Sequence, residues 1–420
     1  MFAAFSTALS ALDANGVAVD VVGNNLANLN TPGYKESASY FRDLVSASMG
    51  AGGTQLGFGV AAPLTIRQFT QGAIQASSGS LDAAIQGDGF FVVQNGAATQ
   101  FTRAGNFQTD LSGNLLTPTG DYVQGWTASN GVVNTGGPIG NIVIPVGSMQ
   151  APAATSSFTL DANLDASAAG GTQWSTPITV YDSLGTAHVL TMNFTKSSTA
   201  SNTWSYTVSI PAADVTSGSP TQFPTPPAPA GTLQFGLNAA GQDGQLTAAN
   251  SSPVNFAISN LSDGAQPLSL NWDLFNADGS GRITQYAQAS SATANSQNGS
   301  AAAQLTQVAM GNGGQILATY SNGQQVVVGQ LALASIRNPQ SLLAVGNNEF
   351  QVQADTAPPA IGVAGTGGRG DVLGGSLESS NVDIAQELTK LIVLQSAYQA
   401  NSKVVTTVNT LAQATTNLIT

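Results

Sequence analysis

Large apolar residues recur at steps of three and four along the first thirty residues of the chain. Two interleaved series, each repeating every seven residues, consist of Phe2, Leu9, Gly16 and Gly23, and of Phe5, Leu12, Val19 and Leu26. This spacing is typical of the narrow apolar seam with which helices pack in a coiled coil. Alanine residues flank the seam and would let a second helix approach closely. The pattern predicts a helix that ends near Asn28, ahead of a turn at Pro32 and Gly33.

The other end of the chain repeats this pattern. Ile384, Leu391, Tyr398, Val405, Ala412 and Ile419 also fall every seven residues, and the stripe is widened by Leu388, Leu394, Val408, Leu411 and Leu418. Ser379, Ser380 and Asn381 precede this run and Asp383 lies early in it, as at a helix start. We expect a second helix from about residue 381 to the end of the sequence.

Between the two ends the apolar period changes from seven to two, which is typical of strands. Asp88-Gly89 precedes the apolar run Phe90 to Val93, and Ser321-Asn322-Gly323 lies between two alternating runs as in a hairpin. The predicted strands of the central segment are Pro177 to Tyr181, His188 to Phe194, Trp204 to Ile210, Thr232 to Leu237 and Leu268 to Phe275. Pro224, Pro226, Pro227 and Pro229 predict an exposed loop among them.

These patterns predict a multi-domain, mainly β protein with α-helical termini. The N- and C-terminal helices would pair as a coiled-coil-like layer, with nested, discontinuous β domains outside it. The predicted domains are 1–30 plus 376–420 as the helical inner core, 31–70 plus 369–375 as an extended connecting segment, 71–148 plus 299–368 as a β-rich middle domain, and 149–298 as a β-rich outer inserted domain.

The energetics of the two ends favour association between copies of the chain. Each large apolar residue of the first helix contributes roughly 1.5–3 kcal/mol when fully buried. Ordering the helix backbone costs on the order of 1–2 kcal/mol per residue. A lone pair of helices with no globular body beside it would bury only one face of each helix. We therefore expect ends that become ordered when copies associate, with seam residues as the assembly element.

Charge and residue usage exclude several classes of protein. Charged residues make up 8% of the chain and the net charge is -12, so binding to nucleic-acid phosphates is not expected. There is no cysteine and one histidine, which excludes disulfides, thiolate metal sites and multi-histidine sites. No apolar run is long enough for membrane insertion. The first basic residue is Lys35, so we expect export without a cleaved signal peptide.

The candidate chemical sites each have a simpler structural interpretation. His188 lies in a strand pattern and has no evident partner, so a strand-face histidine is favoured over a catalytic base. The segments around Asp110 and Asp278 are similar to calcium loops but lack the spaced acidic ligands, and are interpreted as turns. Nothing pairs Asp82 with Asp88 as acid and base. We predict no catalytic residue, no cofactor and no metal site.

Two motifs resemble the signatures of the bacterial flagellar rod and hook family. The first runs from Gly23 to Lys35 and the second from Ser380 to Asn401. The residues that carry the resemblance are Asn25, Ala27, Asn28, Thr31, Pro32, Gly33, Tyr34 and Lys35 at one end, and Asn381, Val382, Asp383, Glu387, Gln395 and Asn401 at the other. Phe101 to Phe107 also resembles the β core of that family. The length and the central insertion look most like the hook members.

The resemblance implies a structural, non-enzymatic subunit that polymerises into a short curved tube and acts as a universal joint, transmitting torque from motor and rod to filament. It implies that the partners are copies of the same chain, the distal rod protein, the hook cap protein, the hook–filament junction proteins and the flagellar export apparatus. It also implies an extracellular location in the hook and basal-body region of the flagellum.

Other functions fit part of the pattern. Within the family, a distal rod protein or a hook–filament junction protein shares the two ends. Outside it, Trp126, Trp174, Trp204 and Trp272 and the acidic, weakly charged composition are compatible with a secreted β-rich adhesin or carbohydrate-binding module. A secreted hydrolase lacks an identifiable nucleophile or base. Both of these classes leave the apolar seams at the two ends unexplained.

Overall fold

The computed structural model describes residues 2–45, 57–129, 131–147, 149–224, 230–236, 243–247 and 252–417. The chain divides into two compact units. Unit 1 comprises Met1–Val146, Gln307–Thr319 and Gln325–Thr420, and unit 2 comprises Gly147–Thr306 and Tyr320–Gln324. Predicted positions 226, 227, 229, 418 and 419 lie outside the described residues.

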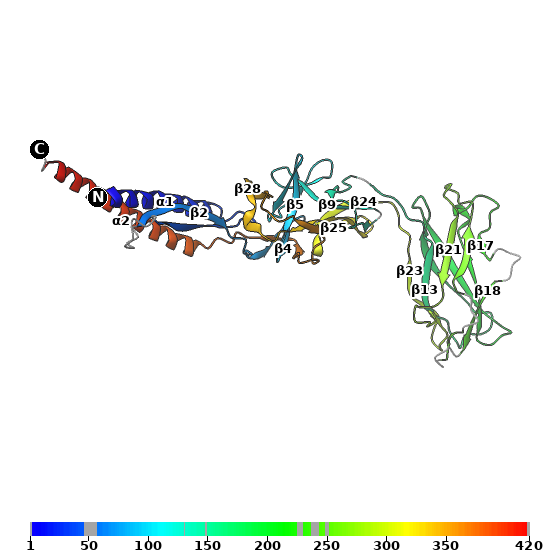
Figure 1. Cartoon of the computed structure of the whole chain (residues 1–420). Helices are drawn as coiled ribbons and strands as arrows, with labels where there is room; N and C mark the ends of the chain where they lie inside the picture. The colour runs from blue at the N-terminus through cyan, green and yellow to red at the C-terminus, as the bar shows by residue number, and fades with distance from the viewer. Residues whose placement is uncertain are drawn as a thin grey trace. The chain divides into compact units, whose positions relative to one another are not determined.

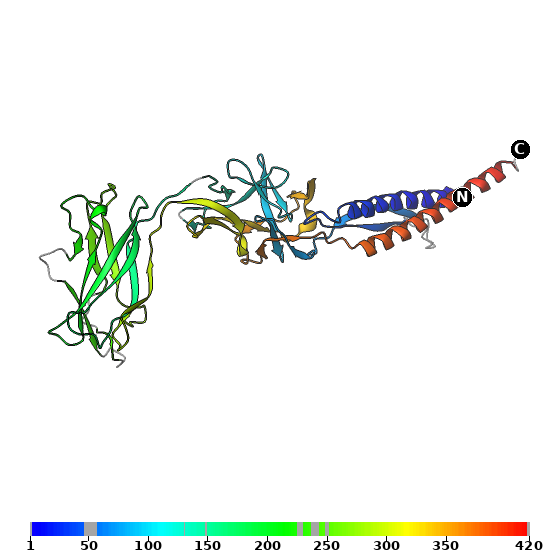
Figure 2. The same cartoon turned by 180° about the vertical axis from the view of Figure 1, so that it is seen from behind.

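Both chain ends are helical and belong to unit 1. Helix α1 spans Phe2–Ala27 and helix α2 spans Ile384–Asn417. The two helices pack against each other and lie side by side in both views (Figures 1 and 2), which confirms the predicted pairing. Asp383 begins α2, because its carboxylate accepts hydrogen bonds from the backbone N–H groups of Ala385 and Gln386, at 2.8 and 3.2 Å.

An antiparallel hairpin covers a second face of α1. Strand β1 (Ser37–Val45) pairs with β2 (Gly57–Arg67), with Ser37 opposite Arg67, and β2 packs along α1. The predicted extended connecting segment, 31–70, contains this hairpin, which the apolar pattern had not placed beside the two helices. The hairpin supplies the third element that a two-helix layer lacks, and it closes on α1 where the hydroxyl of Ser10 accepts a hydrogen bond from the backbone N–H of Val60 at 3.2 Å.

The rest of unit 1 is an antiparallel β body. Its strands are β3 (Ile74–Ala76), β4 (Ala83–Gln86), β5 (Phe90–Asn95), β6 (Ala98–Thr102), β7 (Gln108–Thr109), β8 (Leu115–Leu116), β9 (Tyr122–Ser129), β10 (Val132–Val133), β11 (Gly140–Asn141), β25 (Gln315–Tyr320), β26 (Gln325–Leu331), β27 (Leu333–Ser335), β28 (Leu343–Gly346), β29 (Glu349–Gln351), β30 (Ala360–Gly362), β31 (Asp371–Gly374) and β32 (Ser376–Glu378). Strands β25, β26, β9, β5, β6, β29 and β28 are neighbours in that order. Short 3₁₀ helices span Asn312–Gly314 and Pro339–Ser341.

Strand pairing joins the two halves of the sequence in this body. Strand β3 pairs with β32 and β4 pairs with β31, so segments that lead out of the N-terminal helix lie beside segments that lead into the C-terminal one. Between β25 and β26 the predicted hairpin turn is confirmed: Gly323 has a φ of +79° and Tyr320 N–H donates to Gln324 O at 2.9 Å. The core of the body contains Phe90, Val92, Phe101, Trp126, Ala332, Ala334, Ile336 and Phe350.

Unit 2 is an all-β domain with its own core. Its strands are β12 (Met149–Gln150), β13 (Ser157–Asn163), β14 (Gln173–Tyr181), β15 (Ala187–Lys196), β16 (Thr203–Ser209), β17 (Gln222–Phe223), β18 (Gly231–Gly236), β19 (Gln245–Leu246), β20 (Val254–Ile258), β21 (Leu268–Asp273), β22 (Ile283–Thr284), β23 (Ser291–Gln297) and β24 (Ala303–Met310), the last running on into unit 1. A 3₁₀ turn spans Ala212–Asp214. The five strands predicted for this segment coincide with β14, β15, β16, β18 and β21 to within a few residues.

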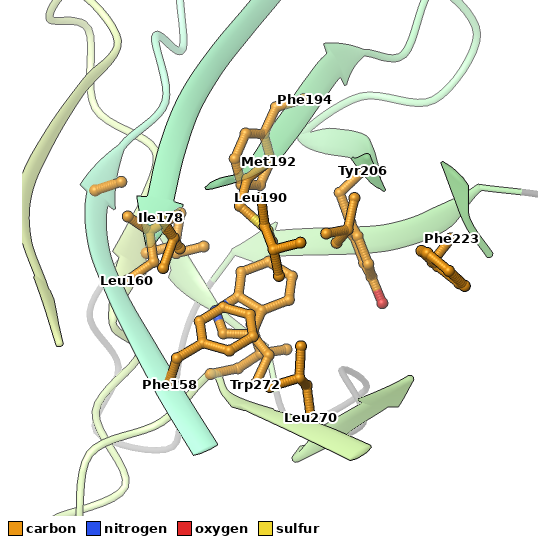
Figure 3. Packing of buried hydrophobic residues seen from close by; sticks show 14 of the residues in the cluster. Phe158, Leu160, Ile178, Leu190, Met192, Phe194, Tyr206, Phe223, Leu270 and Trp272 are labelled. Carbon is orange, nitrogen blue, oxygen red and sulfur yellow. The ribbon is translucent and has the colours of Figure 1, made fainter. Parts of the chain in front are cut away.

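Alternating residues of these strands build the core of unit 2. In β15, Leu190, Met192 and Phe194 are buried while the residues between them are exposed or half-buried. Figure 3 shows these side chains gathered with Phe158 and Trp272, whose rings stack with their planes 8° apart. Trp204 and Trp272 are fully buried and Trp174 stacks on Phe194, so these tryptophans serve packing and form no exposed carbohydrate platform.

Over the residues that the structure describes, neither helix carries an apolar stretch long enough to cross a membrane.

Candidate functional site: the junction of the chain ends and the exposed helical surface

Lys35, at the end of the first motif, belongs to a buried ion-pair network in unit 1. Lys35 Nζ donates to Glu378 Oε1 at 2.6 Å and to the carbonyl oxygen of Thr70 at 2.7 Å. Arg103 Nη1 lies 3.3 Å from the other carboxylate oxygen of Glu378, and its Nη2 donates to Gly87 O at 2.9 Å. Lys35 and Glu378 are fully shielded from solvent and Arg103 nearly so. One carboxylate therefore serves two buried cations.

Burial and pairing act against each other in this network. Burial lowers the pKa of Lys35 and of Arg103, and the charge and hydrogen bonds of Glu378 partly restore both. The carboxylate also accepts a hydrogen bond from the backbone N–H of Gly72 at 2.8 Å. Such a network is weak support for stability by itself, but removal of one partner leaves a charge buried without compensation.

A second polar cluster ties α1 to α2. Asn25, which is buried at the C-terminal end of α1, donates from Nδ2 to Ser37 O at 2.8 Å and to Glu387 Oε2 at 3.1 Å. Its Oδ1 accepts hydrogen bonds from Ser37 N–H at 3.0 Å and from the Tyr34 hydroxyl at 3.3 Å. Glu387 is buried and pairs with Lys390 at 2.6 Å. All the hydrogen-bonding atoms of the Asn25 amide group thus find partners on the hairpin, the turn and the second helix.

The residues between strand β32 and helix α2 anchor the hairpin of β1 and β2. Asn381 Oδ1 accepts from Glu36 N–H at 2.7 Å, and its Nδ2 donates to Gln68 O and Thr70 Oγ1, each at 3.0 Å. Val382 is buried beside it and Asp383 caps α2. A single asparagine therefore holds the start of β1 and the end of β2 against the entrance to α2.

The turn after α1 requires a glycine. Gly33 has a φ of +68°, its N–H donates to Glu378 O at 2.7 Å, and a Cβ there would lie 2.5 Å from the carbonyl carbon of Arg103. Before it, Thr31 Oγ1 donates to Asn28 Oδ1 at 3.1 Å, and Pro32 O accepts from Asn348 Nδ2 at 3.0 Å. The predicted Pro-Gly turn thus brings α1 onto the β body.

The remaining motif residues lie on the helices themselves. Ala27 is the exposed last residue of α1, and Asn401 donates to Ala397 O at 2.9 Å within α2. Gln395 and Tyr398 are exposed, and they line a hollow of about 340 Å³ with Gly16, Val19 and Asp20 of α1.

The predicted seam residues are not the ones that bury α1 in the single chain. The buried face of α1 is formed by the small residues Ala8, Ala14 and Ala18, with Val22 and Asn25. Phe5, Leu9, Ile384, Leu388, Tyr398 and Leu411 are exposed, and Leu12, Val19, Leu26, Leu391, Leu394, Val405 and Val408 are half-buried. Phe2 begins α1, and its side chain lies outside the described part of the chain. The alanines allow close packing within one chain and leave large side chains uncovered.

Apolar residues outside the predicted seams are also exposed on the two helices and the hairpin. Ile392 and Val393 of α2 are 64% and 61% exposed. The hairpin adds Tyr40, Phe41, Leu44, Phe58 and Leu64, all exposed. We call the exposed apolar residues of α1, α2 and the hairpin the helical-layer surface. Large apolar side chains left exposed on elements that pack together are typical of interaction sites in soluble proteins.

A buried carboxyl pair lies where the first motif meets the β body. Glu349 of β29 and Asp121 are both nearly shielded from solvent, and the Thr119 hydroxyl donates to Asp121 Oδ2 at 2.7 Å and lies 3.4 Å from Glu349 Oε1. Burial, with the hydrogen bond and charge of Asp121, raises the pKa of Glu349 to about 7. Glu349 also lines a cavity of about 380 Å³ together with Asn28, Thr31 and Pro32.

This raised pKa predicts that unit 1 loses stability as the pH rises from about 4.5 to about 7. Because the folded pKa lies above the ordinary value of 4.5, the contribution of Glu349 is fully present below pH 4.5 and is lost as pH rises through about 7. The loss is on the order of 3 kcal/mol. Glu349→Gln is expected to remove this slope, measured as urea midpoints against pH. The exposed Asp355→Asn variant should keep the wild-type slope. Parallel profiles for wild type and Glu349→Gln would contradict the assignment.

The other candidate residues take part in hydrogen bonds and ion pairs within the fold. Asp110 Oδ1 accepts from the N–H groups of Ser112 and Asn114, each at 2.8 Å, and Asp278 Oδ1 accepts from Ser280 N–H at 2.9 Å, so both segments are turns as predicted. Asp82 accepts from the Ser77 hydroxyl. The expectation that His188 lacks a partner is wrong, because Asp182 and Asp214 each lie 3.1 Å from its ring nitrogens. Both carboxylates come from loops that sequence periodicity does not place.

Comparisons with known protein families agree with this arrangement. Residues 5–35 match the flagella basal body rod protein family, 84–164 the flagellar hook protein FlgE/F/G D1 domain, 150–300 the flagellar basal body protein FlaE D2 domain, and 373–418 the flagellar basal body rod FlgEFG protein C-terminal family. The first and last of these matches contain all the residues of the two motifs, which meet where Asn25 contacts Glu387.

Whole-chain relatives extend the similarity to the full length. The chain is 33% identical to the flagellar hook protein FlgE of Borreliella burgdorferi, with 98% of each chain covered. It is 32% identical to that of Treponema pallidum over the whole of both chains, and 30% identical to that of Escherichia coli over 99% of this chain and 100% of the relative.

A solved structure shares the fold. The crystal structure of Helicobacter pylori flagellar hook protein FlgE2 superposes with a TM-score of 0.50 at 15% identity, covering 71% of this chain and 99% of that one. With whole-chain identities of 30% or more, the chain belongs to the family of flagellar hook proteins, and it is a structural subunit of the flagellar hook.

Proposed function

We propose that this chain polymerises with copies of itself into the curved, flexible tube of the hook, which acts as a universal joint and transmits torque from motor and rod to filament. The helical-layer surface is the observation that carries the proposal. Its large apolar side chains are uncovered in a single chain, and each contributes roughly 1.5–3 kcal/mol if fully buried by neighbours. We assign assembly to the seam residues of α1 and α2 and to the family-motif residues that hold α1, α2 and the hairpin together.

The buried junction gives this layer its fixed geometry. Lys35, Glu378, Asn25 and Asn381 hold both helices and the hairpin to one another and to the β body through buried hydrogen bonds. A subunit whose helices and hairpin are held rigidly can transmit torque without bending where they join the β body. We therefore propose that residues 1–30 plus 376–420 act as the inner, torque-bearing layer and that the β domains lie outside it.

Flexibility is assigned to the outer β domains. The exposed face of unit 2 is rich in Ser, Thr, Asn and Gln, as in β23, whose residues Ser291 to Ser296 are all exposed. Polar contacts at such a surface contribute little each and can be exchanged for water with a small change in free energy. Neighbouring subunits could then slide past one another as the tube rotates.

The wider setting is also proposed from the family relationship. We place the chain outside the cell, next to the distal rod protein at one end of the tube and the hook–filament junction proteins at the other. We also infer growth under a hook cap protein, with delivery by the flagellar export apparatus. Its role is mechanical rather than catalytic. The tryptophans buried in the core disfavour the adhesin alternative.

The test is electron microscopy of concentrated, purified chain by negative stain. Full-length protein is expected to form curved tubes. A variant lacking residues 1–70 and 379–420 keeps the β3–β32 pairing but loses both helices and the hairpin, and is expected to remain monomeric in sedimentation. Tubes formed by the truncated variant would place the assembly element elsewhere, and straight rods from the full chain would favour a rod role.

A further inference from the structure

Four titratable side chains meet at one end of the unit 2 sheet. Asp182 follows β14, His188 lies near the start of β15, Asp214 ends the 3₁₀ turn, and Asp263 lies in the loop before β21. Hydrogen bonds between these loops hold them together. Ser262 N–H donates to Asp214 O at 3.0 Å, and Gln266 N–H donates to Ser183 Oγ at 2.9 Å. The four groups therefore belong to a tied loop cluster rather than to separate turns.

The spacing of three of these groups fits a metal ion. One ligand atom from each of Asp182, His188 and Asp263 lies within 4.8 Å of the other two, and His188 Nε2 is 3.1 Å from Asp182 Oδ2. Ligand bonds of about 2.0–2.2 Å place neighbouring nitrogen and oxygen ligands about 3–3.5 Å apart. Asp182 and His188 are buried while Asp263 is exposed, so the cluster has an inner wall and a side open to solvent.

The fourth carboxylate orients the imidazole. His188 Nδ1 lies 3.1 Å from Asp214 Oδ2, whereas Nε2 on the other side of the ring lies 3.1 Å from Asp182 Oδ2. A carboxylate at one ring nitrogen favours the tautomer that leaves the other nitrogen free to bind a metal. Nε2 is the nitrogen that faces Asp182.

Charge at the cluster is unbalanced. In the part of the chain that the structure describes, His188 is the only basic side chain that pairs with these carboxylates. Asp182, Asp214 and Asp263 thus place three carboxyl groups around a single imidazole.

We propose that Asp182, His188 and Asp263 bind one divalent transition-metal ion of the Zn²⁺ class, with Asp214 positioning the imidazole and water completing the coordination. Mixed imidazole and carboxylate donors suit such ions better than Mg²⁺ or Ca²⁺, which prefer oxygen ligands alone. A bound ion would connect three loops of unit 2. All the proposed ligands lie in unit 2, so metal binding does not depend on polymerisation.

Isothermal titration calorimetry of the metal-free, full-length chain with Zn²⁺ tests the proposal, with excess Mg²⁺ present to occupy exposed carboxylates. One ion should bind per chain. Asp263→Asn and His188→Gln should each weaken binding at least 10-fold. The matched control Asp278→Asn, an exposed turn aspartate of the same unit, should bind as wild type does.

Asp263 is exposed, so Asp263→Asn is expected to fold even if His188→Gln does not. Zn²⁺ should raise the thermal midpoint of wild type and of Asp278→Asn but not that of Asp263→Asn. Two results would each overturn the proposal: no saturable binding by wild type, or equal affinity in Asp263→Asn and wild type.

Discussion

Glu378→Gln is expected to lower the free energy of unfolding of unit 1 by about 3–5 kcal/mol. Glu378 is fully buried and is the shared partner of Lys35 and Arg103. A glutamine keeps the size of the side chain but leaves two buried cations without a counter-charge. Chemical denaturation followed by tryptophan fluorescence would measure the change, because Trp126 lies in the core of that unit.

A double-mutant cycle separates this effect from a simple loss of packing. Lys35→Met removes one of the two buried cations, so the Lys35→Met/Glu378→Gln variant should lose less stability than the sum of the two single variants. Asp355→Asn removes an exposed carboxylate and should leave the unfolding free energy within about 0.5 kcal/mol of wild type. Additive losses in the cycle would show that the three charges do not act as a network.

Ile392→Asp is expected to abolish tube formation while leaving the single chain folded. Ile392 is 64% exposed, so the monomer should change by no more than about 0.5 kcal/mol. In a polymer the same position would bury an aspartate without a partner and lose roughly 1.5–3 kcal/mol of apolar burial in every copy. Sedimentation and negative-stain microscopy at matched concentrations would measure assembly, and circular dichroism would check the fold.

Two variants make this prediction specific to the helical-layer surface. Ile392→Val keeps most of the apolar area and should still form tubes. Val132→Asp changes a valine that is 71% exposed but lies in β10, away from the helices, and should also assemble. Tubes from Ile392→Asp at wild-type yield would show that α2 does not bury this face in the polymer.

Local periodicity was enough to predict most of the elements. The three-and-four spacing of α1 and α2 and the alternation in β14, β15 and β16 depend on which face of one element is apolar, and the sequence records that directly. The turns at Gly33 and Gly323 were predictable for a similar reason, since a positive φ favours glycine. The hairpin of β1 and β2 was not predicted: Phe58, Val60, Leu64 and Ile66 of β2 alternate, but in its partner β1 the apolar residues Tyr40 and Phe41 are adjacent and give no strand period.

The contacts between distant residues could not be predicted in the same way. Glu378 meets Lys35 across 343 positions of sequence, and no local pattern assigns it that partner. The flanking alanines predicted close helix approach, but that Ala8, Ala14 and Ala18 form the buried face of α1 in the single chain depends on the elements packed beside the helix. The partners of His188 lie in loops, whose course depends on the strands that they connect.

By itself the sequence determined that this protein has helical ends with apolar stripes, a β-rich middle and two family motifs, because these depend on the order of neighbouring residues. The folded chain was needed to show that the alanine face of α1 is buried, that the hairpin packs along α1, and that Asn25 and Glu387 join the two motifs. The reason is physical: burial is shared between elements, so which of several apolar faces is covered depends on what the rest of the chain places beside it.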